Sequence, residues 1–309
     1  MDSAEQKLRD ALAAELSPWA GDIDAIVPLT GGLSSECFRV DLSAPPEGLP
    51  SRSVLRMIRD DGMADREVLI QNWVSAQGIP APRVFRSGHA RCAFRRPYAL
   101  MAHVEGANPL AAGAMRRLPH LLAKIMAKLH ALSSDGLRAK SSDLGWSRGL
   151  EELRNASRPE IAQAAATLVG RSVSDDAVIC HGDLHPMNLL MRDGEVVALL
   201  DWELSVLGPR EYDVARTELL FLMMPGTSRL LRPVLLLLGR RAARQFVEAY
   251  AAHHRLNPEA LDFFRRYHVL RLIGVTRIPG LSSIGAARLW RPLERSLVKR
   301  WTKITGAPL

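Results

Sequence analysis

The segment HGDLHPMNLL (His181–Leu190) is followed by LLDWE (Leu199–Glu203), and these two stretches decide the fold. In them Asp183 and Asn188 are five residues apart, and Asp201 comes 13 residues after Asn188. An acid, an amide and a second acid at these intervals are side chains of the kind that phosphoryl transfer requires. A lone HGD would be no more than a polar turn before a strand.

A predicted β-hairpin connects the two stretches. Asp193-Gly194 separates two apolar runs, which is typical of a tight hairpin turn. The hairpin is expected to bring Asn188 and Asp201 together, so that an amide oxygen and a carboxylate are available to Mg²⁺. Asp183, in the loop before the hairpin, can accept a hydrogen bond from a substrate hydroxyl. Its spacing from Asn188 equals the acid-to-amide spacing of the H-R-D-L-x-x-x-N catalytic loop of kinases.

The composition is that of a globular protein with one large or two modest domains. The chain has 309 residues, of which 47% are hydrophobic and 24% are charged, enough to bury a sizeable core. Its net charge of +8 and its pI near 9.8 admit anionic partners such as nucleotides, nucleic acids or acidic membranes. The basic residues after Leu207 are scattered among apolar residues rather than clustered. We therefore expect no nucleic-acid partner.

The cysteines and the apolar segments bear on compartment and on membrane association. Cys37, Cys92 and Cys180 stand far apart without C-x-x-C spacing, which argues against a disulfide framework and against a zinc site. The N-terminal segment is charged and helical in pattern, unlike a signal peptide. The most apolar run, Leu230–Gly239, contains Arg and Pro and is too short to span a bilayer. We expect a soluble, cytoplasmic protein without membrane insertion.

The first hundred residues predict a small antiparallel sheet that carries a helix. Apolar residues recur at helical intervals over residues 3–16 and again over Met63–Gly78. Strands are expected where β-forming residues alternate with polar ones or lie next to turn signals. These segments are Ala25–Leu42, read as strand, glycine turn and strand, then Ser53–Ile58, Ile79–Gly88 and Tyr98–Gly106.

After Gly106 the pattern becomes helical. Ala111–Leu132 predicts one long amphipathic helix, and the chain from Val214 onward is mostly helical in pattern. We therefore predict an α+β protein of two lobes with a cleft between them. Residues 1–104 would form a sheet-rich lobe that binds nucleotide, and residues 105–309 a larger helical lobe with the catalytic loop, its β-hairpin and the acceptor pocket.

The HGD stretch and LLDWELSVLGPREYDVAR (Leu199–Arg216) resemble the aminoglycoside phosphotransferase and choline kinase family, which has a protein-kinase-like fold. The resemblance covers most of the chain and weakens toward the C-terminus. It implies that Asp183 is the catalytic base and that Asn188 and Asp201 bind Mg²⁺. It also implies that Asp213 braces the catalytic loop from beneath. DWE followed by Gly-Pro is similar to a broad bacterial branch rather than to the classical antibiotic-resistance enzymes.

Residues of the first lobe are expected to hold the nucleotide. Glycines and serines of TGGLSS (Thr30–Ser35) allow close backbone approach and can reach an anion, although a plain glycine turn is the alternative. Arg56 stands where the family often has the Lys that contacts the α- and β-phosphates, and Arg can bind phosphate bidentately. Glu67 is its natural partner, unless the two form only a surface ion pair. The candidate nucleotide-binding residues here are Gly31, Gly32, Ser34, Ser35, Arg56 and Glu67.

The strand at Tyr98–Gly106 is predicted to connect the lobes. By resemblance, backbone groups of Ala102–Val104, including His103, would contact the adenine edge, and Met101 would lie near the gatekeeper position. An ordinary buried strand is the alternative. One departure from the family pattern is Met187, where Gly is frequent, and a bulkier residue there crowds the substrate side of the loop without removing a ligand.

The acceptor is expected to be a hydroxylated small molecule. The segment after Val214 is poor in acids and rich in Arg, so charge complementarity disfavours a polycationic acceptor and favours a neutral, apolar or anionic one. Lipophilic alcohols of the macrolide kind would suit the apolar and aromatic residues there, such as Phe263, Phe264 and Tyr267.

We therefore predict a phosphotransferase that moves the γ-phosphate of ATP, or of GTP, to a substrate hydroxyl with Mg²⁺. The missing DFG and APE signals argue against a protein kinase. A non-catalytic nucleotide-binding or scaffold protein of the same fold is the alternative, and intact Asp183, Asn188 and Asp201 argue against it. His185 would either contact phosphate or brace the loop.

Overall fold

The computed structural model describes residues 3–17, 21–29, 36–58, 61–141, 144–168, 177–223, 232–276, 287–307 and 309, with residues 3, 232–233, 276 and 287–293 described by their backbone alone. The chain forms two compact units. The first contains Met1–Met115 and Pro186–Ser205, and the second contains Arg116–His185 and Val206–Leu309. The lobe boundary proposed at 104/105 lies within the first unit. The HGD loop and the hairpin that follows it belong to different units.

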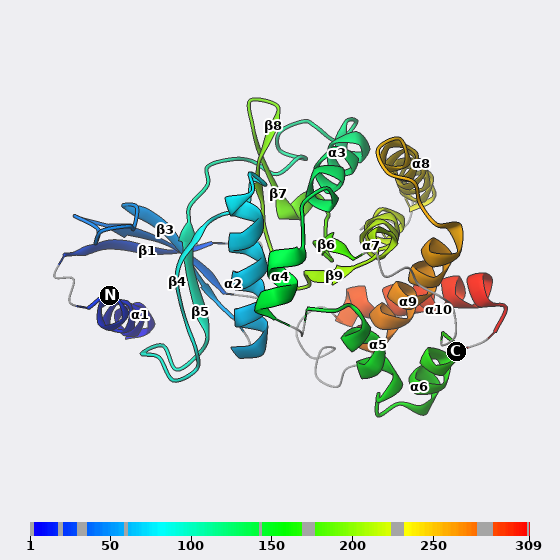
Figure 1. Ribbon diagram of the computed structural model, residues 1–309, viewed down its shortest axis with the longest axis horizontal. Coiled ribbons are helices and arrows are strands. Elements are labelled where there is room, and N and C mark those ends of the chain that lie inside the picture. The colour runs from blue at the N-terminus through cyan, green and yellow to red at the C-terminus, as the bar shows by residue number, and fades with distance from the viewer. Residues whose placement is uncertain are drawn as a thin grey trace. The chain divides into compact units, whose positions relative to one another are not determined.

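A five-stranded antiparallel sheet and two helices make up most of the first unit (Figure 1). The antiparallel pairing of its strands confirms the predicted small antiparallel sheet. The strands in spatial order are β1 (Ile23–Leu29), β2 (Cys37–Leu42), β3 (Arg52–Met57), β5 (Tyr98–Ala102) and β4 (Val84–Gly88), and the helices are α1 (Ser3–Glu15) and α2 (Asp61–Ala76).

The two faces of this sheet build separate cores. Successive residues of a strand point to opposite faces, so neighbours on one strand join different helices. Leu55 of β3 belongs to the core that contains Leu12 of α1. Met101 of β5 belongs to the core on the other side, which α2 covers. Arg56, the neighbour of Leu55, therefore faces the α2 side, where Glu67 lies.

The hairpin predicted around Asp193-Gly194 is confirmed. β7 (Leu189–Arg192) pairs with β8 (Glu195–Leu199) in an antiparallel ladder. Both turn residues have positive φ, 54° for the Asp and 82° for the Gly, as a two-residue turn of type I′ requires. At the open end, the backbone N–H of Leu200 donates to the carbonyl of Asn188 at 2.8 Å. The register therefore places residues 188 and 201 at the same end of the hairpin.

Helices dominate the second unit (Figure 1). α3 packs on α8, α8 on α7, α7 on α9 and α9 on α10. A short pair of strands, β6 (Val178–Cys180) and β9 (Val206–Gly208), lies beside α3 and α7. The helices are α3 (Leu118–His130), α4 (Asp135–Lys140), α5 (Ser147–Arg154), α6 (Pro159–Ala166), α7 (Arg210–Leu222), α8 (Arg232–Ala251), α9 (Pro258–Thr276) and α10 (Ala287–Thr305).

The prediction of one long helix over Ala111–Leu132 is wrong about where the helix begins. The observed helix begins at Leu118, and the residues before it form turns. Pro119 lacks a backbone N–H and fits only in the first turn of a helix, and Gly113 has a φ of 67°, which a right-handed helix excludes. Within the described residues, no helix is long and apolar enough to cross a membrane.

Candidate active site

In the first unit, Arg56 lies among three carboxylates. Its Nη1 is 3.1 Å from Glu67 Oε1, and its Nη2 is 2.8 Å from Asp201 Oδ1 and 3.2 Å from Glu203 Oε2. Arg56 and Glu67 are buried, whereas the Asp201 side chain keeps 31% of its surface exposed. The predicted pairing of Arg56 with Glu67 is present. Glu203 was missed by sequence reasoning, although its place two residues after Asp201 was a usable signal.

This cluster carries more negative than positive charge. One guanidinium faces the carboxylates of Glu67, Asp201 and Glu203, and carboxylate oxygen is the ligand that hard divalent cations prefer. Burial, partly offset by Arg56, raises the pKa of Glu67 to about 7. The exposed edge of the cluster is Asp201, so a cation that arrives from solvent meets this carboxylate.

The backbone at Asp201 has an uncommon conformation. Its φ is 64°, in the left-handed region that Asp and Asn tolerate better than most other residues. The next residue, Trp202, is fully buried and donates from Nε1 to the carbonyl of Leu199 at 3.1 Å. Since Asn188 is buried at the same end of the hairpin, the pair offers an amide and a carboxylate that fit Mg²⁺. Met187, the departure from the family pattern, is exposed.

In the second unit, Asp183 is held between two basic side chains. Its Oδ1 accepts hydrogen bonds from Nε (3.2 Å) and Nη2 (2.8 Å) of Arg216, and its Oδ2 is 3.4 Å from Nε2 of His185. Burial would raise the pKa of Asp183, but His185 and Arg216 together hold it well below its usual range. Asp183 is therefore an ionised acceptor at neutral pH. Sequence reasoning missed Arg216, which lies inside the matching GPREYDVAR stretch but carries no spacing signal of its own.

The brace expected from Asp213 is present. Its carboxylate accepts the backbone N–H groups of His181 and Gly182, both at 2.8 Å. His130 lies 3.2 Å from the same carboxylate and 2.6 Å from Tyr250 Oη, so it is a satisfied core histidine. These groups are all buried. A buried carboxylate thus fixes the two residues that precede Asp183.

His130, Asp213 and Cys180 place one potential ligand atom each within 4.8 Å of one another. The carboxylate already accepts two backbone N–H groups, and burial raises the pKa of the Cys180 thiol well above its usual value. A protonated thiol is a poor metal ligand. We assign this cluster to the brace of the loop rather than to a metal centre.

The remaining predicted nucleotide contacts lie in or near the sheet of the first unit. Met101 is buried in β5, with its Sδ 3.7 Å from Nε2 of Gln71. His103 follows β5 and is half-buried, and burial together with Arg52 lowers its pKa. Their contacts with adenine stay predictions. The residues that fall outside the described part of the chain are Gly31, Gly32, Ser34 and Ser35.

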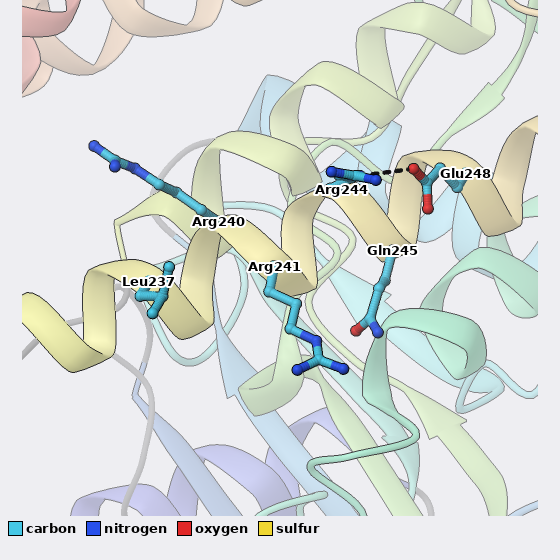
Figure 2. A pocket seen from close by; sticks show the side chains of 6 residues that line it. All are labelled: Leu237, Arg240, Arg241, Arg244, Gln245 and Glu248. Atoms are coloured by element: carbon cyan, nitrogen blue, oxygen red, sulfur yellow. Dashed lines mark hydrogen bonds and ion pairs between the residues drawn. The ribbon is translucent and has the colours of Figure 1, made fainter.

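A pocket lies along α8 in the second unit (Figure 2). Two of its lining residues, Arg244 and Glu248, form an ion pair at 2.8 Å. It contains none of the predicted catalytic, nucleotide-binding or metal-binding residues. Its lining consists of Leu237, Arg240, Arg241, Arg244, Gln245 and Glu248.

Comparison with known sequences identifies one family. A sequence model of the phosphotransferase enzyme family matches residues 25–238. Acyl-CoA dehydrogenase family member 11 of Pongo abelii is 24% identical over 178 residues, which are 51% of this chain and 23% of that protein. The protein of the same name from Gallus gallus is 27% identical over 171 residues, 49% of this chain and 22% of that protein. The match spans less than a quarter of the length of these curated relatives.

Solved structures share the fold across nearly the whole chain. A protein of Ralstonia eutropha JMP134 described as an aminoglycoside phosphotransferase has a TM-score of 0.67 at 18% identity, with 98% of this chain and 99% of that chain covered. Aminoglycoside phosphotransferase APH(4)-Ia, in a ternary complex with AMP-PNP and hygromycin B, has a TM-score of 0.62 at 16% identity, with 97% and 98% covered. Macrolide 2′-phosphotransferase MphH of Brachybacterium faecium has a TM-score of 0.56 at 15% identity, with both chains covered in full. The predicted two-lobed, protein-kinase-like α+β fold is confirmed.

Proposed function

Because the chain belongs to the phosphotransferase enzyme family, we propose that it moves the γ-phosphate of ATP, or of GTP, to a hydroxyl group of a small molecule with Mg²⁺. The observation that carries this proposal is the state of Asp183. It is an ionised carboxylate in a loop that Asp213 fixes from beneath, as the acid that orients an attacking hydroxyl has to be.

Asp183 would act as the hydroxyl acceptor. The acceptor oxygen forms a bond to the γ-phosphorus, the bond from that phosphorus to the bridging oxygen breaks, and the nucleoside diphosphate leaves. The hydroxyl proton passes to Asp183. Because the transition state of phosphoryl transfer is loose, orientation contributes more than basicity, and a carboxylate with a low pKa suits this role.

Asn188 and Asp201 would hold Mg²⁺, which when bound neutralises charge on the phosphates. Arg56, fixed by Glu67, would contact phosphate oxygens. We assign adenine contacts to the backbone after Met101, with His103 among them, and phosphate cover to the loop of Gly31, Gly32, Ser34 and Ser35. These assignments rest on the family pattern and on the Arg56 cluster.

The acceptor we propose is a hydroxylated small molecule that is not strongly cationic, in a protein of the cytoplasm with no nucleic-acid partner. APH(4)-Ia was solved with hygromycin B, and MphH is a macrolide phosphotransferase. That these proteins act with small molecules of this kind supports the reaction class for this chain. The alternative, a non-catalytic nucleotide-binding or scaffold protein, predicts nucleotide binding without transfer.

The first experiment is a thermal-shift titration with ATP, GTP and ADP, each with and without Mg²⁺. A ligand that binds the folded state alone stabilises it by about 2.7 kcal/mol at a hundredfold excess over Kd. We expect a Mg²⁺-dependent rise of the unfolding midpoint with one nucleoside triphosphate. Asp201→Ala should lose this rise. The matched control is Asp193→Asn in the exposed hairpin turn, which should keep it.

The outcomes separate the two candidate functions. A Mg²⁺-dependent shift, followed by release of diphosphate only when hydroxylated compounds are added, supports the enzyme. A shift without release in the presence of a broad set of hydroxylated compounds favours the binding protein. If no nucleotide shifts the unfolding midpoint, the result contradicts both candidate roles of the Arg56 cluster.

A further inference from the structure

Arg271 on α9 is a partly buried cation whose protein partners are neutral. Its Nη1 donates hydrogen bonds to the hydroxyls of Tyr212 at 3.0 Å and Tyr267 at 3.4 Å. In the part of the chain that the structure describes, no carboxylate lies within ion-pair distance of it, and its Nε and Nη2 donate no hydrogen bond. A guanidinium in this state keeps an uncompensated charge and unused donors.

The other arginines of α9 behave differently, since both form ion pairs. Arg265 lies 2.6 Å from Glu218, and Arg266 lies 2.7 Å from Asp262. Glu152 on α5 exerts an electrostatic influence on Arg271, but its carboxylate pairs with Arg148 at 3.3 Å on the exposed surface. The open charge of Arg271 is therefore a local exception.

A chain of contacts connects Arg271 with the catalytic loop. Tyr212, its hydrogen-bond partner, lies one turn of α7 before Arg216, so both face the same side of that helix. Arg216 in turn binds Asp183 through two donors. His268, one turn before Arg271, is fully buried with its Nε2 2.8 Å from the carbonyl of Tyr212. Burial, followed by the charges of Arg216 and Arg271, holds the pKa of His268 well below its usual value.

Close packing builds the Arg271 position. Gly149 on α5 lies so near α9 that a β-carbon there would collide with the Tyr267 hydroxyl, while Arg271 Nη1 would be 3.5 Å away. Tyr267 is fully buried. The two tyrosines thus hold one edge of the guanidinium through Nη1, and the donors of the other edge make no hydrogen bond to the described residues.

We propose that Arg271 and Arg216 form an anion subsite beside Asp183 that binds a carboxylate or phosphate group of the acceptor substrate. This inference rests on the proposed phosphotransfer and names the acceptor class: a small molecule that bears both a hydroxyl and an oxyanion. The planar fork of Arg matches a carboxylate or phosphate through two parallel hydrogen bonds. A cationic acceptor would instead meet the uncompensated charge of Arg271.

The experiment measures anion binding without nucleotide. The unfolding midpoint is titrated with inorganic phosphate at constant ionic strength for the wild type, Arg271→Gln, Arg271→Lys and Arg266→Gln. Arg266→Gln is the matched control because it removes a charge from the same helix and leaves the subsite intact. We expect saturable stabilisation of the wild type and of the control. The apparent affinity for phosphate should be at least about tenfold weaker in Arg271→Gln and intermediate in Arg271→Lys.

A second measurement uses the wild type alone, so that it stands even if Arg271→Gln does not fold. Glycerate, glycerol and amino-propanediol form a matched series with anionic, neutral and cationic groups. Glycerate should displace phosphate, and the cationic member should not. Equal phosphate responses in all four proteins, or displacement by the cationic member, would overturn the subsite.

Nucleotide binding distinguishes this inference from the proposed function. Arg271→Gln should keep the Mg²⁺-nucleotide shift of the wild type. A tenfold loss of nucleotide affinity in that variant, with unchanged phosphate binding, would assign Arg271 to the donor and overturn the acceptor subsite. The protein could also bind phosphate through Arg271 but bind no nucleotide. That result would support the anion site and contradict the proposed phosphotransferase function.

Discussion

Asp183 is kept as a carboxylate by Arg216 and His185, and this determines what a substitution of its side chain can change. Arg216 and His185 hold its pKa below the usual range in spite of burial. Asp183 is therefore fully ionised above the ordinary pKa of a carboxyl group. In the proposed reaction the side chain would serve mainly to position a hydroxyl, and the amide of Asn has nearly the same shape but no charge to accept the proton.

Asp183→Asn should therefore separate transfer from binding. The rate of transfer should fall by about 10²–10⁴-fold, the usual range for a group that accepts or donates the proton, while the affinity for the Mg²⁺-nucleotide stays within about twofold. Steady-state kinetics and the thermal shift measure the two quantities. Asp193→Asn in the hairpin turn is the control. Near-normal turnover by Asp183→Asn would show that another group accepts the proton.

The raised pKa of Glu67 predicts that the stability of the folded protein depends on pH. Burial raises its pKa to about 7 from an ordinary value of 4.5, so between these values the folded state holds a proton that the unfolded state releases. The contribution of Glu67 to stability is present at pH 4.5 and is lost as the pH rises through 7, by on the order of 3 kcal/mol. Arg56, Asp201, Glu203 and Arg66 are the charged groups that act on it.

Glu67→Gln tests this prediction because the amide does not titrate. Unfolding midpoints of both proteins are measured without nucleotide from pH 5 to pH 8. The wild type should lose stability relative to Glu67→Gln as the pH rises. Since the other titrating groups are shared, most of their contributions cancel in the difference. A constant difference would mean that the carboxylate is ionised throughout.

At the scale of elements, α7 supports the loop that carries Asp183 through one buried carboxylate. Asp213 accepts two backbone N–H groups and faces His130. Asp213→Asn keeps one acceptor oxygen but turns an amide N–H₂ toward a donor. Breaking such a buried network should cost about 3–5 kcal/mol of unfolding free energy, which urea denaturation measures.

The control for Asp213→Asn is Asp262→Asn on α9. Asp262 pairs with Arg266 near the surface, where an ion pair contributes about 0–1 kcal/mol. Transfer by Asp213→Asn should also fall, because the loop that carries Asp183 loses its support. Equal effects of the two substitutions on stability would refute the brace.

Local signals explain which elements could be predicted from sequence. The Asp193-Gly194 turn and the alternating strands carry their structure within a few residues, so the hairpin and the sheet were foreseen. The predicted start of α3 was wrong because the helical spacing of apolar residues was given more weight than Pro119 and Gly113. Arg216 was missed because Asp183, which it contacts, lies 33 residues away in sequence and no local rule reports such a contact. Glu203 lies 147 residues from Arg56, and only its place two residues after Asp201 could have pointed to it.

At the scale of the whole molecule, the candidate machinery is divided between two compact units. Asp183 belongs to the second and Asn188 to the first, and the chain passes from one to the other between His185 and Pro186. The prediction that Asp183 and Asn188 take part in one reaction came from the resemblance to a family and not from the hydrophobic periodicity of the sequence. Their spacing along the chain was visible from the start, whereas their division between units was not.

The net charge of +8 predicts how association responds to salt. The Mg²⁺-nucleotide and the proposed acceptor are anions, so the positive field of the protein should speed their encounter, and dissolved salt should screen it. We expect kcat/KM to fall several-fold between about 20 mM and 300 mM salt. The Debye length shortens from roughly 20 Å to 6 Å over this range. The turnover number kcat should change little, because the ion pair of Arg56 with Glu67 is buried.

The matched control is a neutral hydroxylated acceptor under the same conditions. At saturating nucleotide, its kcat/KM should be nearly independent of salt, while that of an anionic acceptor falls. An equal response of both acceptors would show that salt acts on the protein as a whole rather than on encounter with an anion. A rise of kcat/KM with salt for the anionic acceptor would mean that the acceptor approaches through a region of negative potential, against the assignment of Arg216 and Arg271.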